Sequence, residues 1–448
     1  MTSPTPPAVM SDLAGAAGTT NHVGAPGDDE RADVVVVGAG VIGLVSAWRL
    51  AQRGASVVVV DPAPGSGATG VAAGMLAPVT EARLGEEPLL RLNLASWARW
   101  PAFADEVEAA SGRSIGYRAD GTLMVALDAD DRALLDDLAA RHRVMGLEVE
   151  QMRGREARRL EPGLAPGVRA GLLAASERSV DPAALGEALL AAATAAGVRV
   201  VRAAVDHLVT DGEAGAGGAG VGGVGGAGRV TGVDVPGVGA TPRRRISAGT
   251  VVLAAGCRSG GIAGLADHAR PPVRPIKGQI LTLRQPVDDP LVTHTVRGIV
   301  QGSSIYLVPR DDGRVIVGAT VEERGWDTSP TAGGAYELLR DALALVPGLD
   351  QAELVAVRAG LRPGSPDDLP MIGASGVDGL IVATGHHRNG ILLTPVTGDA
   401  VAAVVAGDPL PDEVSACDPR RFGAAPAVGA EHDAGGVPSP AGRSAAHR

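Results

Sequence analysis

The sequence predicts an α/β fold in which one domain is assembled from distant segments of the chain and a second, antiparallel sheet is inserted into it. Three observations support this prediction. A strand, a glycine-rich turn, a helix and a second strand follow one another within residues 33–61. Apolar strand segments that end in small residues recur at 250–256 and 379–385. Several strand segments with few helices lie within residues 269–354.

Length and charge narrow the possibilities. The chain has 448 residues, enough for two or three domain-sized units, and 45% of them are hydrophobic. Its formal net charge of −11 disfavours nucleic acid and anionic membranes as partners. No segment is apolar over the roughly 20 residues that a membrane-spanning helix needs, and no secretory signal is evident before Arg31. Because Cys257 and Cys417 are too few for a disulfide framework, we expect a cytoplasmic protein.

Three segments are of low complexity. Residues 1–30 and 420–448 lack hydrophobic periodicity, and we expect them to be disordered tails. Gly212–Gly228 separates the strand-like segments VRVVRAAVDHLVT and RVTGVDV, and we expect it to be a long, flexible hairpin loop. No chemistry is expected in this loop.

The first strand, helix and second strand are DVVVVG, VIGLVSAWRLAQRG and ASVVVVD. Gly38 permits a tight turn after the strand, Gly40 lets the backbone approach a diphosphate, and Gly43 lets the helix pack closely. The helix N-terminus supplies N–H groups and a positive dipole for the phosphates. Asp61 can accept hydrogen bonds from a ribose, although an aspartate before Pro62 can also be an ordinary helix cap. The pattern is typical of a Rossmann-like, dinucleotide-binding domain.

The remaining elements are predicted in the same way. Asp181, Pro182 and Gly197 mark a helix by its N-cap, its first-turn proline and its terminal glycine. Further helices are expected near 89–111, 128–146 and 333–345, and strands at GTLMVAL, QILTLR, SIYLVP, RVIVGAT and GLIVAT.

Three further segments point to the ligand. The loop GSGATGVAAGMLAP, residues 65–78, is made of small residues that let the chain press against a flat ring system, which a flavin needs more than a nicotinamide does. TVVLAAGCRSG, residues 250–260, ends a strand in small residues, although a buried strand and a turn would explain it as well. GHHRNGILL, residues 385–393, gathers polar side chains after GLIVAT. No further His or Cys stands at ligand spacing, so no metal site is expected.

Together these segments resemble the FAD-dependent amine and amino-acid oxidases of the D-amino-acid oxidase type, and among them the glycine oxidases of thiamine biosynthesis. The segments AAGMLAP, YLVPR, VGAT, AGLRPG and GHHRNGILL occur in the same order as in those enzymes. The resemblance runs from about Asp33 to about Gly407. It implies non-covalently bound FAD, a small amine or amino acid as substrate, and O2 as electron acceptor.

The resemblance also divides the chain. It implies a discontinuous FAD-binding domain of residues 31–110, 165–268 and 355–407, and a substrate domain of residues 111–164 and 269–354. The positions expected to contact FAD are Gly38, Gly40, Val41, Ile42, Gly43, Asp61, Pro62, Ala68, Thr69, Ala73, Gly74, Met75, Val205, Ala255, Gly256, His386, His387, Arg388, Asn389, Gly390, Ile391 and Leu392.

The segment 385–393 is expected to form the loop after the strand GLIVAT and the start of a helix. Its N–H groups would then face the N1/C2=O edge of the flavin, where reduction places negative charge. The two histidines, His386 and His387, are equally well explained as a satisfied polar loop.

An amino-acid oxidase must fix the substrate carboxylate so that the α-hydrogen points at flavin N5, and a planar guanidinium does this with two parallel bonds. Arg362, in LRPG just after a strand, is the expected clamp, and Tyr306 would add a phenolic hydrogen bond. A surface ion pair and sheet packing are the alternatives for these two. Arg310 is the competing guanidinium. Met75 would wall the pocket or simply fill the core, and the resemblance puts Arg388 near the substrate.

The expected reaction is hydride transfer from the α-carbon of a neutral amine to the flavin, giving an imine that hydrolyses to an oxo acid and ammonia, while O2 is reduced to H2O2. Ser304 stands where relatives can carry a histidine, so glycine, sarcosine and small D-amino acids all stay open as substrates. The alternatives are a D-amino-acid or sarcosine oxidase, a dehydrogenase with another acceptor, and a non-catalytic nucleotide-binding protein. A thiazole synthase downstream and a homo-oligomer are both compatible with the sequence.

Overall fold

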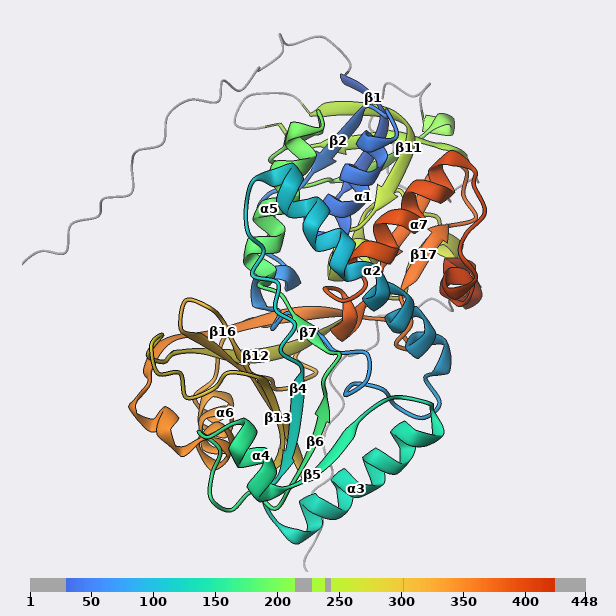
Figure 1. Ribbon diagram of the computed structural model, residues 1–448. Helices are drawn as coiled ribbons and strands as arrows, with labels where there is room; N and C mark the ends of the chain where they lie inside the picture. The colour runs from blue at the N-terminus through green and yellow to red at the C-terminus, as the bar shows by residue number, and fades with distance from the viewer. Residues whose placement is uncertain (1–29, 214–227, 238–242, 301, 424–448) are drawn as a thin grey trace, which may run out of the picture.

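The computed structural model describes residues 30–213, 228–237, 243–300 and 302–423. Two large sheets form the molecule, one in the upper half and one in the lower half of Figure 1. The two expected tails and the loop Gly212–Gly228 fall almost wholly outside the described ranges. Within these ranges, no helix combines the length and the apolar character that crossing a membrane requires.

The first sheet is largely parallel and carries the glycine-rich turn. Its elements are β1 (Glu30–Val37), α1 (Val41–Gln52), β2 (Val57–Val60), α2 (Glu87–Ser111), α5 (Pro182–Ala195), β8 (Arg199–Val201), β9 (His207–Thr210), β10 (Val230–Val235), β11 (Arg244–Leu253), β17 (Met371–Ala374), β18 (Leu380–Thr384) and α7 (Thr394–Ala406). The strand order is β17-β18-β11-β1-β2-β8, and β1 pairs in parallel with both β2 and β11. β17 joins one edge antiparallel, and β9 and β10 form an antiparallel extension beside β11.

Both faces of this sheet are buried, which explains its unbroken runs of valine. Val34 and Val36 pack in a core formed with α1, α2, α5 and α7, which cover one face in Figure 1. Val35 and Val37 point the other way, into a cluster with β9 and β10. Because successive residues of a strand face opposite sides, a strand that is covered on both sides is apolar throughout.

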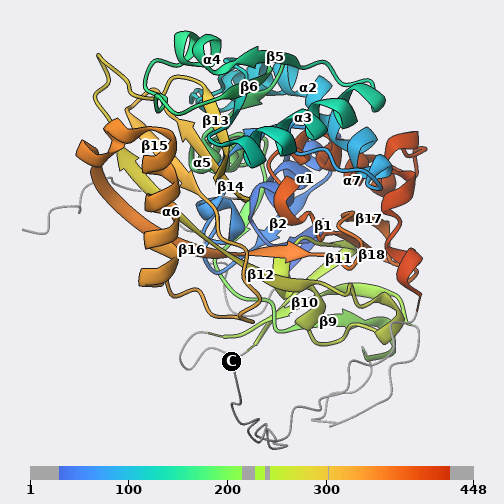
Figure 2. The same ribbon diagram turned by 90° about the horizontal axis from the view of Figure 1, so that it is seen from below.

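The second sheet is mostly antiparallel. Its elements are β4 (Thr122–Ala126), α3 (Ala129–Val144), β5 (Glu150–Arg153), α4 (Gly154–Leu160), β6 (Ala170–Ala174), β12 (Arg274–Arg284), β13 (Thr295–Val300), β14 (Ser303–Pro309), β15 (Arg314–Gly318), α6 (Ala332–Leu345) and β16 (Glu353–Gly364). The order is β16-β12-β15-β14-β13-β4-β6-β5, with β13 and β4 paired in parallel. β16 crosses the boundary between the two halves in Figure 1, and Figure 2 shows it from below beside β12.

The structure confirms the predicted α/β architecture and the helix that begins at Asp181. The Asp181 carboxylate accepts hydrogen bonds from the N–H groups of Ala183 and Ala184, at 2.9 and 3.3 Å, as an N-cap should. The segment VRVVRAAVDHLVT forms two strands, β8 and β9, instead of one. The chain turns between them, where Ala203 N–H bonds to the carbonyl of Val201 at 3.0 Å.

Two strands lie outside the domain limits that the sequence indicated. β6 and β16 fall in segments expected to bind FAD, yet both belong to the second sheet. β6 pairs with β4 along its length, and β16 pairs with β12 from Glu353 to Gly364. The backbone hydrogen bonds of both strands therefore tie them to the second sheet, and the limits at 165 and 355 are too early.

Candidate active site

The glycine-rich turn between β1 and α1 has the geometry that a diphosphate site requires. Gly38 has a positive φ of 105°. A Cβ at Gly43 would lie 1.9 Å from the carbonyl oxygen of Gly38, so the helix can pack this closely on the turn only with glycine at position 43. The N–H of Val41 bonds to Thr69 Oγ1 at 3.2 Å. Among the described residues, the next two N–H groups, of Ile42 and Gly43, have no partner. These two donors at a helix N-terminus fit a phosphate anion.

Asp61 fastens this turn to the end of β2. Its Oδ2 accepts a hydrogen bond from the N–H of Ala39 at 2.7 Å, and its Oδ1 accepts one from the N–H of Ala63 at 2.7 Å. Each carboxylate oxygen can accept a second bond, so the expected contact with a ribose stays a prediction. Pro62 follows on the surface, and Gly40 is the N-cap of α1 without a side-chain cap of its own.

The loop of small residues runs between the two sheets. It contains the turn η1 (Ala68–Val71) and the strand β3 (Met75–Leu76), which pairs with β7 (Arg178–Ser179). Gly74 has a φ of 79°, and a Cβ there would collide with the carbonyl oxygen of Val180. Val71 reaches the second sheet, where it lies against the Cα of Gly360 on β16. Glycine is therefore needed at position 74, where the loop passes close to Val180, and at position 360, where the strand β16 passes close to Val71.

The same loop meets the expected substrate residues. Ala73 and Met75 share an apolar cluster with Tyr306 and with Ile280 of β12. Arg310 is buried, and it donates a hydrogen bond to the carbonyl oxygen of Ala73. The competing guanidinium is thus engaged in holding the loop, which leaves Arg362 as the candidate clamp.

The end of β11 completes the nucleotide side. Ala255 precedes the turn η3 (Gly256–Gly261), and it packs with Val205 against the cluster that contains Val37. The crevice at the carboxyl ends of parallel strands is where such sheets bind nucleotides. Burial raises the pKa of the Cys257 thiol to about 12, so this side chain is a neutral thiol at physiological pH.

The segment after β18 forms a turn, and the helix expected within it begins later. The turn η6 (His387–Asn389) precedes α7, which starts at Thr394 because Pro395 occupies its first turn. His386 is buried, and its Nε2 lies 3.0 Å from Thr397 Oγ1. Burial lowers the pKa of His386 to about 3, so the ring is neutral. The His386 side chain therefore holds the turn to α7, which fits the alternative of a polar loop whose hydrogen bonds are satisfied.

The turn lies against the second sheet. An isolated β-bridge joins His386 to Gly364 at the end of β16. His387 has a φ of 45°, and its Nδ1 lies 3.0 Å from Asp368 Oδ1. Asn389 is buried, and its N–H bonds to the carbonyl of His386 at 2.9 Å. The predicted flavin segment and the strand that carries Arg362 are thus neighbours.

The end of this segment is anchored by α2 and α7. The carbonyl of Leu392 accepts hydrogen bonds from Ser96 Oγ at 2.7 Å and from Trp100 Nε1 at 2.8 Å. The carbonyl of Gly390 accepts one from Thr394 Oγ1 at 3.0 Å. Ile391 and Leu392 pack in the core of the first sheet. Their side chains serve the fold, so any contact with a flavin would come from their backbone.

Arg362 lies within β16 and not after it, because the strand continues to Gly364. Its Nη1 donates to the carbonyls of Thr320, at 3.2 Å, and Lys277, at 3.5 Å. The guanidinium lies flat against Gly278 of β12, where a Cβ would come within 2.5 Å of Arg362 Cζ. A glycine on the neighbouring strand therefore makes room for the Arg362 guanidinium.

Tyr306 lies on β14, opposite Gly318 of β15 and Arg297 of β13. Burial raises the pKa of its phenol, and the positive charge of Arg362 opposes the shift. The hydroxyl is therefore protonated at neutral pH and can donate a hydrogen bond. Ser304, two residues earlier on the same strand, is exposed.

Arg388 belongs to an ion-pair cluster that sequence reasoning missed. Its Nη2 lies 2.7 Å from Glu86 Oε2, and its Nε lies 3.9 Å from Glu81 Oε2. Glu81 also pairs with Arg297 at 3.2 Å, and Arg297 is the cross-strand neighbour of Tyr306. The cluster therefore lies beside the expected substrate site. The signal was present in the sequence, since both glutamates closely follow the segment AAGMLAP.

The chemistry of these groups is orientation and charge recognition. Among the described residues, no three His, Cys, Asp or Glu side chains come together to hold a metal ion. A cradle for a diphosphate, loops of small residues and a guanidinium beside a tyrosine fit a bound flavin that carries the redox chemistry.

Comparison with known proteins agrees with this geometry. The family described as FAD dependent oxidoreductase (DAO) matches residues 33–404. The glycine oxidase of Geobacillus kaustophilus is 34% identical over 384 residues, which are 84% of this chain and 93% of that protein. A crystal structure of glycine oxidase from the same organism covers 88% of this chain and 99% of its own, with a TM-score of 0.76 and 31% identity.

A second relative is larger than this chain. The bifunctional protein ThiO/ThiG of Synechocystis sp. is 31% identical over 401 residues, which are 87% of this chain and 54% of that protein. The chain thus spans about half the length of that relative. With a family match over most of its length, the chain belongs to the DAO family of FAD-dependent oxidoreductases and is a glycine oxidase-like enzyme that uses FAD.

Proposed function

We propose that this enzyme oxidises glycine or another small amino acid, held by its carboxylate, to an imine that hydrolyses to an oxo acid and ammonia. The observation that carries the proposal is the position of Arg362. Its guanidinium lies on the strand that meets the turn at His386 and beside the phenol of Tyr306. This position, next to the expected flavin segments, supports a role for Arg362 as a carboxylate clamp. When bound, FAD supplies the hydride acceptor and the reactivity towards O2.

Contacts within the protein orient the Arg362 guanidinium. One nitrogen of Arg362, Nη1, is held by backbone carbonyls, and the flat face of the guanidinium lies on Gly278. The remaining N–H donors can then form charge-assisted hydrogen bonds to a carboxylate. Tyr306 adds a neutral donor beside them, and Met75 contributes the apolar side of the same cluster.

In this proposal the substrate is glycine, sarcosine or a small D-amino acid. Glycine is favoured by the similarity to glycine oxidases. The exposed Ser304 keeps sarcosine and small D-amino acids as alternatives, and a dehydrogenase with another electron acceptor is the second candidate for the second half-reaction. Supply of an imine for the thiazole of thiamine, in a cytoplasmic setting, is the biological role that we propose from the resemblance and from the match to ThiO/ThiG.

The proposal is tested on the purified holoenzyme. Its visible spectrum should show flavin bands, and peroxide should form under air with glycine, sarcosine or a small D-amino acid. Arg362→Ala should raise KM for glycine at least about tenfold, because it removes charge-assisted hydrogen bonds to the carboxylate. An unchanged KM would remove Arg362 from the clamp, and reduction of the flavin without peroxide would favour the dehydrogenase.

A further inference from the structure

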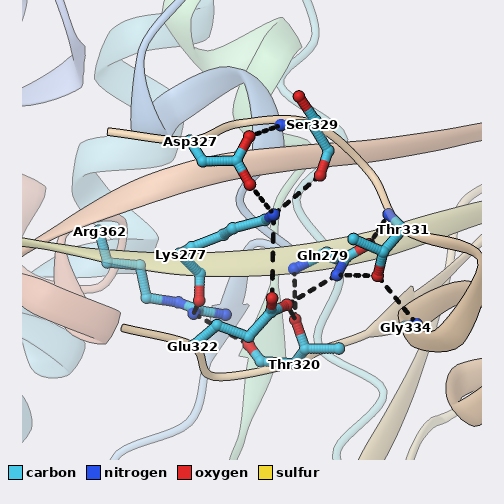
Figure 3. A network of polar contacts seen from close by, with 9 residues as sticks. All are labelled: Lys277, Gln279, Thr320, Glu322, Asp327, Ser329, Thr331, Gly334 and Arg362. Atoms are coloured by element: carbon cyan, nitrogen blue, oxygen red, sulfur yellow. Dashed lines mark hydrogen bonds and ion pairs between the residues drawn. The ribbon is translucent and has the colours of Figure 1, made fainter. Parts of the chain in front are cut away.

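A fully buried lysine lies on the strand next to the clamp. Lys277 has a side-chain exposure of 0% and comes from β12, directly opposite Leu361 of β16. Figure 3 shows its Nζ among oxygens of Asp327, Ser329 and Glu322. The distances are 2.8 Å to Asp327 Oδ2, 2.8 Å to the carbonyl of Ser329 and 3.8 Å to Glu322 Oε2. A buried ammonium is costly unless it is paired, so the Lys277 amine and these three oxygens are expected to stay together.

All three partners belong to one segment. The segment 320–331 connects β15 to α6, and we call it the connecting segment. The pKa of the Asp327 carboxyl is lowered to about 2, chiefly by its hydrogen bond from Lys277, so this carboxylate stays charged across the physiological range. Through one side chain, Lys277 therefore fastens the connecting segment to β12.

Gln279, two residues further along β12, provides a second attachment. Its Nε2 donates to Glu322 Oε1 at 2.7 Å and to Thr331 Oγ1 at 3.0 Å, and its Oε1 accepts from the N–H of Thr331 at 2.7 Å. Its own N–H donates to Thr320 Oγ1 at 2.9 Å. The connecting segment is thus bound to β12 at its first residue, its middle and its last residue (Figure 3).

These contacts lead to the clamp. The two acceptors of Arg362 Nη1 are the carbonyl of Thr320, the first residue of the connecting segment, and the carbonyl of Lys277 itself. Backbone hydrogen bonds between Lys277 and Glu322, both 2.9 Å, and from Thr320 N–H to the carbonyl of Gln279, at 3.2 Å, align the two strands, and the contacts of the buried amine add to them in holding both carbonyls. Arg362 is drawn in Figure 3 at the edge of this network, with no direct contact to the Lys277 amine.

We propose that Lys277 is a positioning residue for substrate binding: by fastening the connecting segment, it keeps the Thr320 carbonyl where it orients the Arg362 guanidinium. This inference rests on the proposed role of Arg362 as carboxylate clamp. It predicts that loss of the ammonium weakens the binding of carboxylates, while the step that follows binding is affected much less.

The test measures carboxylate binding by the holoenzyme separately from turnover. Lys277→Met removes the charge and keeps an unbranched side chain. We expect the Kd for acetate, measured by calorimetry, and KM for glycine both to rise about tenfold, with kcat within about threefold of wild type. Asp327→Asn, at a partly exposed position that tolerates the change, should raise both in the same direction by a smaller factor. It decides the question if Lys277→Met does not fold.

A matched control lies on the same two strands. Arg284→Met removes a cation of β12 that pairs with Glu353 of β16 at 3.4 Å, at the exposed end of the strands. It should leave the Kd for acetate unchanged. Combining Lys277→Met with Arg362→Ala should cost no more than Arg362→Ala alone, because Lys277 acts through Arg362.

The outcomes separate the two proposals. If Arg362→Ala weakens acetate binding but Lys277→Met and Asp327→Asn only lower Tm, with Kd unchanged, Lys277 is a stabilising residue and the positioning role is wrong. If Arg362→Ala itself leaves the Kd for acetate unchanged, the clamp is wrong, and the positioning role is wrong with it.

Discussion

The two expected substrate residues each lie over a glycine of a neighbouring strand. A Cβ at Gly278 would come within 2.5 Å of Arg362 Cζ, and a Cβ at Gly318 would come within 2.5 Å of Tyr306 Cζ. A glycine inside a strand weakens the strand, so its presence calls for a reason such as close approach of another group. Here the approaching groups are the side chains themselves, which are thereby laid flat on the sheet.

Gly278→Ala should therefore disturb the clamp without changing any residue that touches the substrate. The added methyl group would displace the Arg362 guanidinium, because Gly278 has an ordinary backbone conformation and the collision is with a side chain. We expect KM for glycine to rise about tenfold, with FAD content unchanged. Gly249→Ala, in β11, is the control, since a Cβ there makes only an ordinary contact. Wild-type KM in both variants would show that the guanidinium is not held against Gly278.

At the scale of helices and strands, short sequence patterns predicted those elements whose ends are determined by neighbouring residues. The helix after Asp181, the turn at Gly38 and the helix α1 were all predictable, because a cap, a proline or a glycine determines each of them within a few residues. The position of Arg362 within β16 was not, since the strand continues only because β12 pairs with it. Helix α7 begins a few residues later than expected, at Thr394, because Pro395 is suited to the first turn of a helix.

Some residues of the candidate site were expected from the sequence and others were not. Arg362, Tyr306 and Met75 were expected as substrate residues, and the structure brings Met75 and Tyr306 together in one apolar cluster although they lie on different sheets. The cluster of Glu81, Glu86, Arg297 and Arg388 was not predicted, because each glutamate lies more than 200 residues from the arginine that it pairs with. Nor does any local pattern show that Lys277 is buried, as a lysine in a strand usually lies at the surface.

The packing of α1 on the glycine-rich turn gives a prediction at this scale. Gly43→Ala would place a Cβ 1.9 Å from the carbonyl oxygen of Gly38, so the helix would have to move away from the turn. We expect FAD to bind at least about tenfold more weakly, because the N–H groups of the first turn move with the helix. The ratio of flavin absorbance to protein absorbance after dialysis measures this. Gly333→Ala, in the open first turn of α6, is the control. Equal flavin content in both variants would contradict the role of this contact.

At the scale of the whole molecule, two arginines of the second sheet reach the first domain. Arg314 of β15 donates to Asp181 Oδ2 at 2.7 Å, while Asp181 Oδ1 caps α5. Arg310, directly after β14, donates to the carbonyl of Ala73, and burial lowers its pKa to about 10, so it is still charged at neutral pH. Burial alone would raise the pKa of Asp181, but the charges of Arg310 and Arg314 outweigh it and lower the pKa. One carboxylate thus caps α5 and pairs with Arg314 of the second sheet.

Asp181→Asn isolates this link, because an asparagine caps a helix about as well as an aspartate does. We expect the variant to lose about 2 kcal/mol of stability at pH 7, seen as a Tm lower by a few degrees, since a buried guanidinium loses its counter-charge. The folded-state pKa of Asp181 lies below its unfolded value, so the advantage of wild type is present above about pH 4 and disappears as the pH falls through the folded-state pKa. Asp128→Asn, at the N-cap of α3, where the carboxylate receives only a backbone bond, is the matched control and should shift Tm much less. If the two variants lose the same stability at pH 7, Asp181 acts only as a cap, and the two halves of the molecule are joined by packing without this charge.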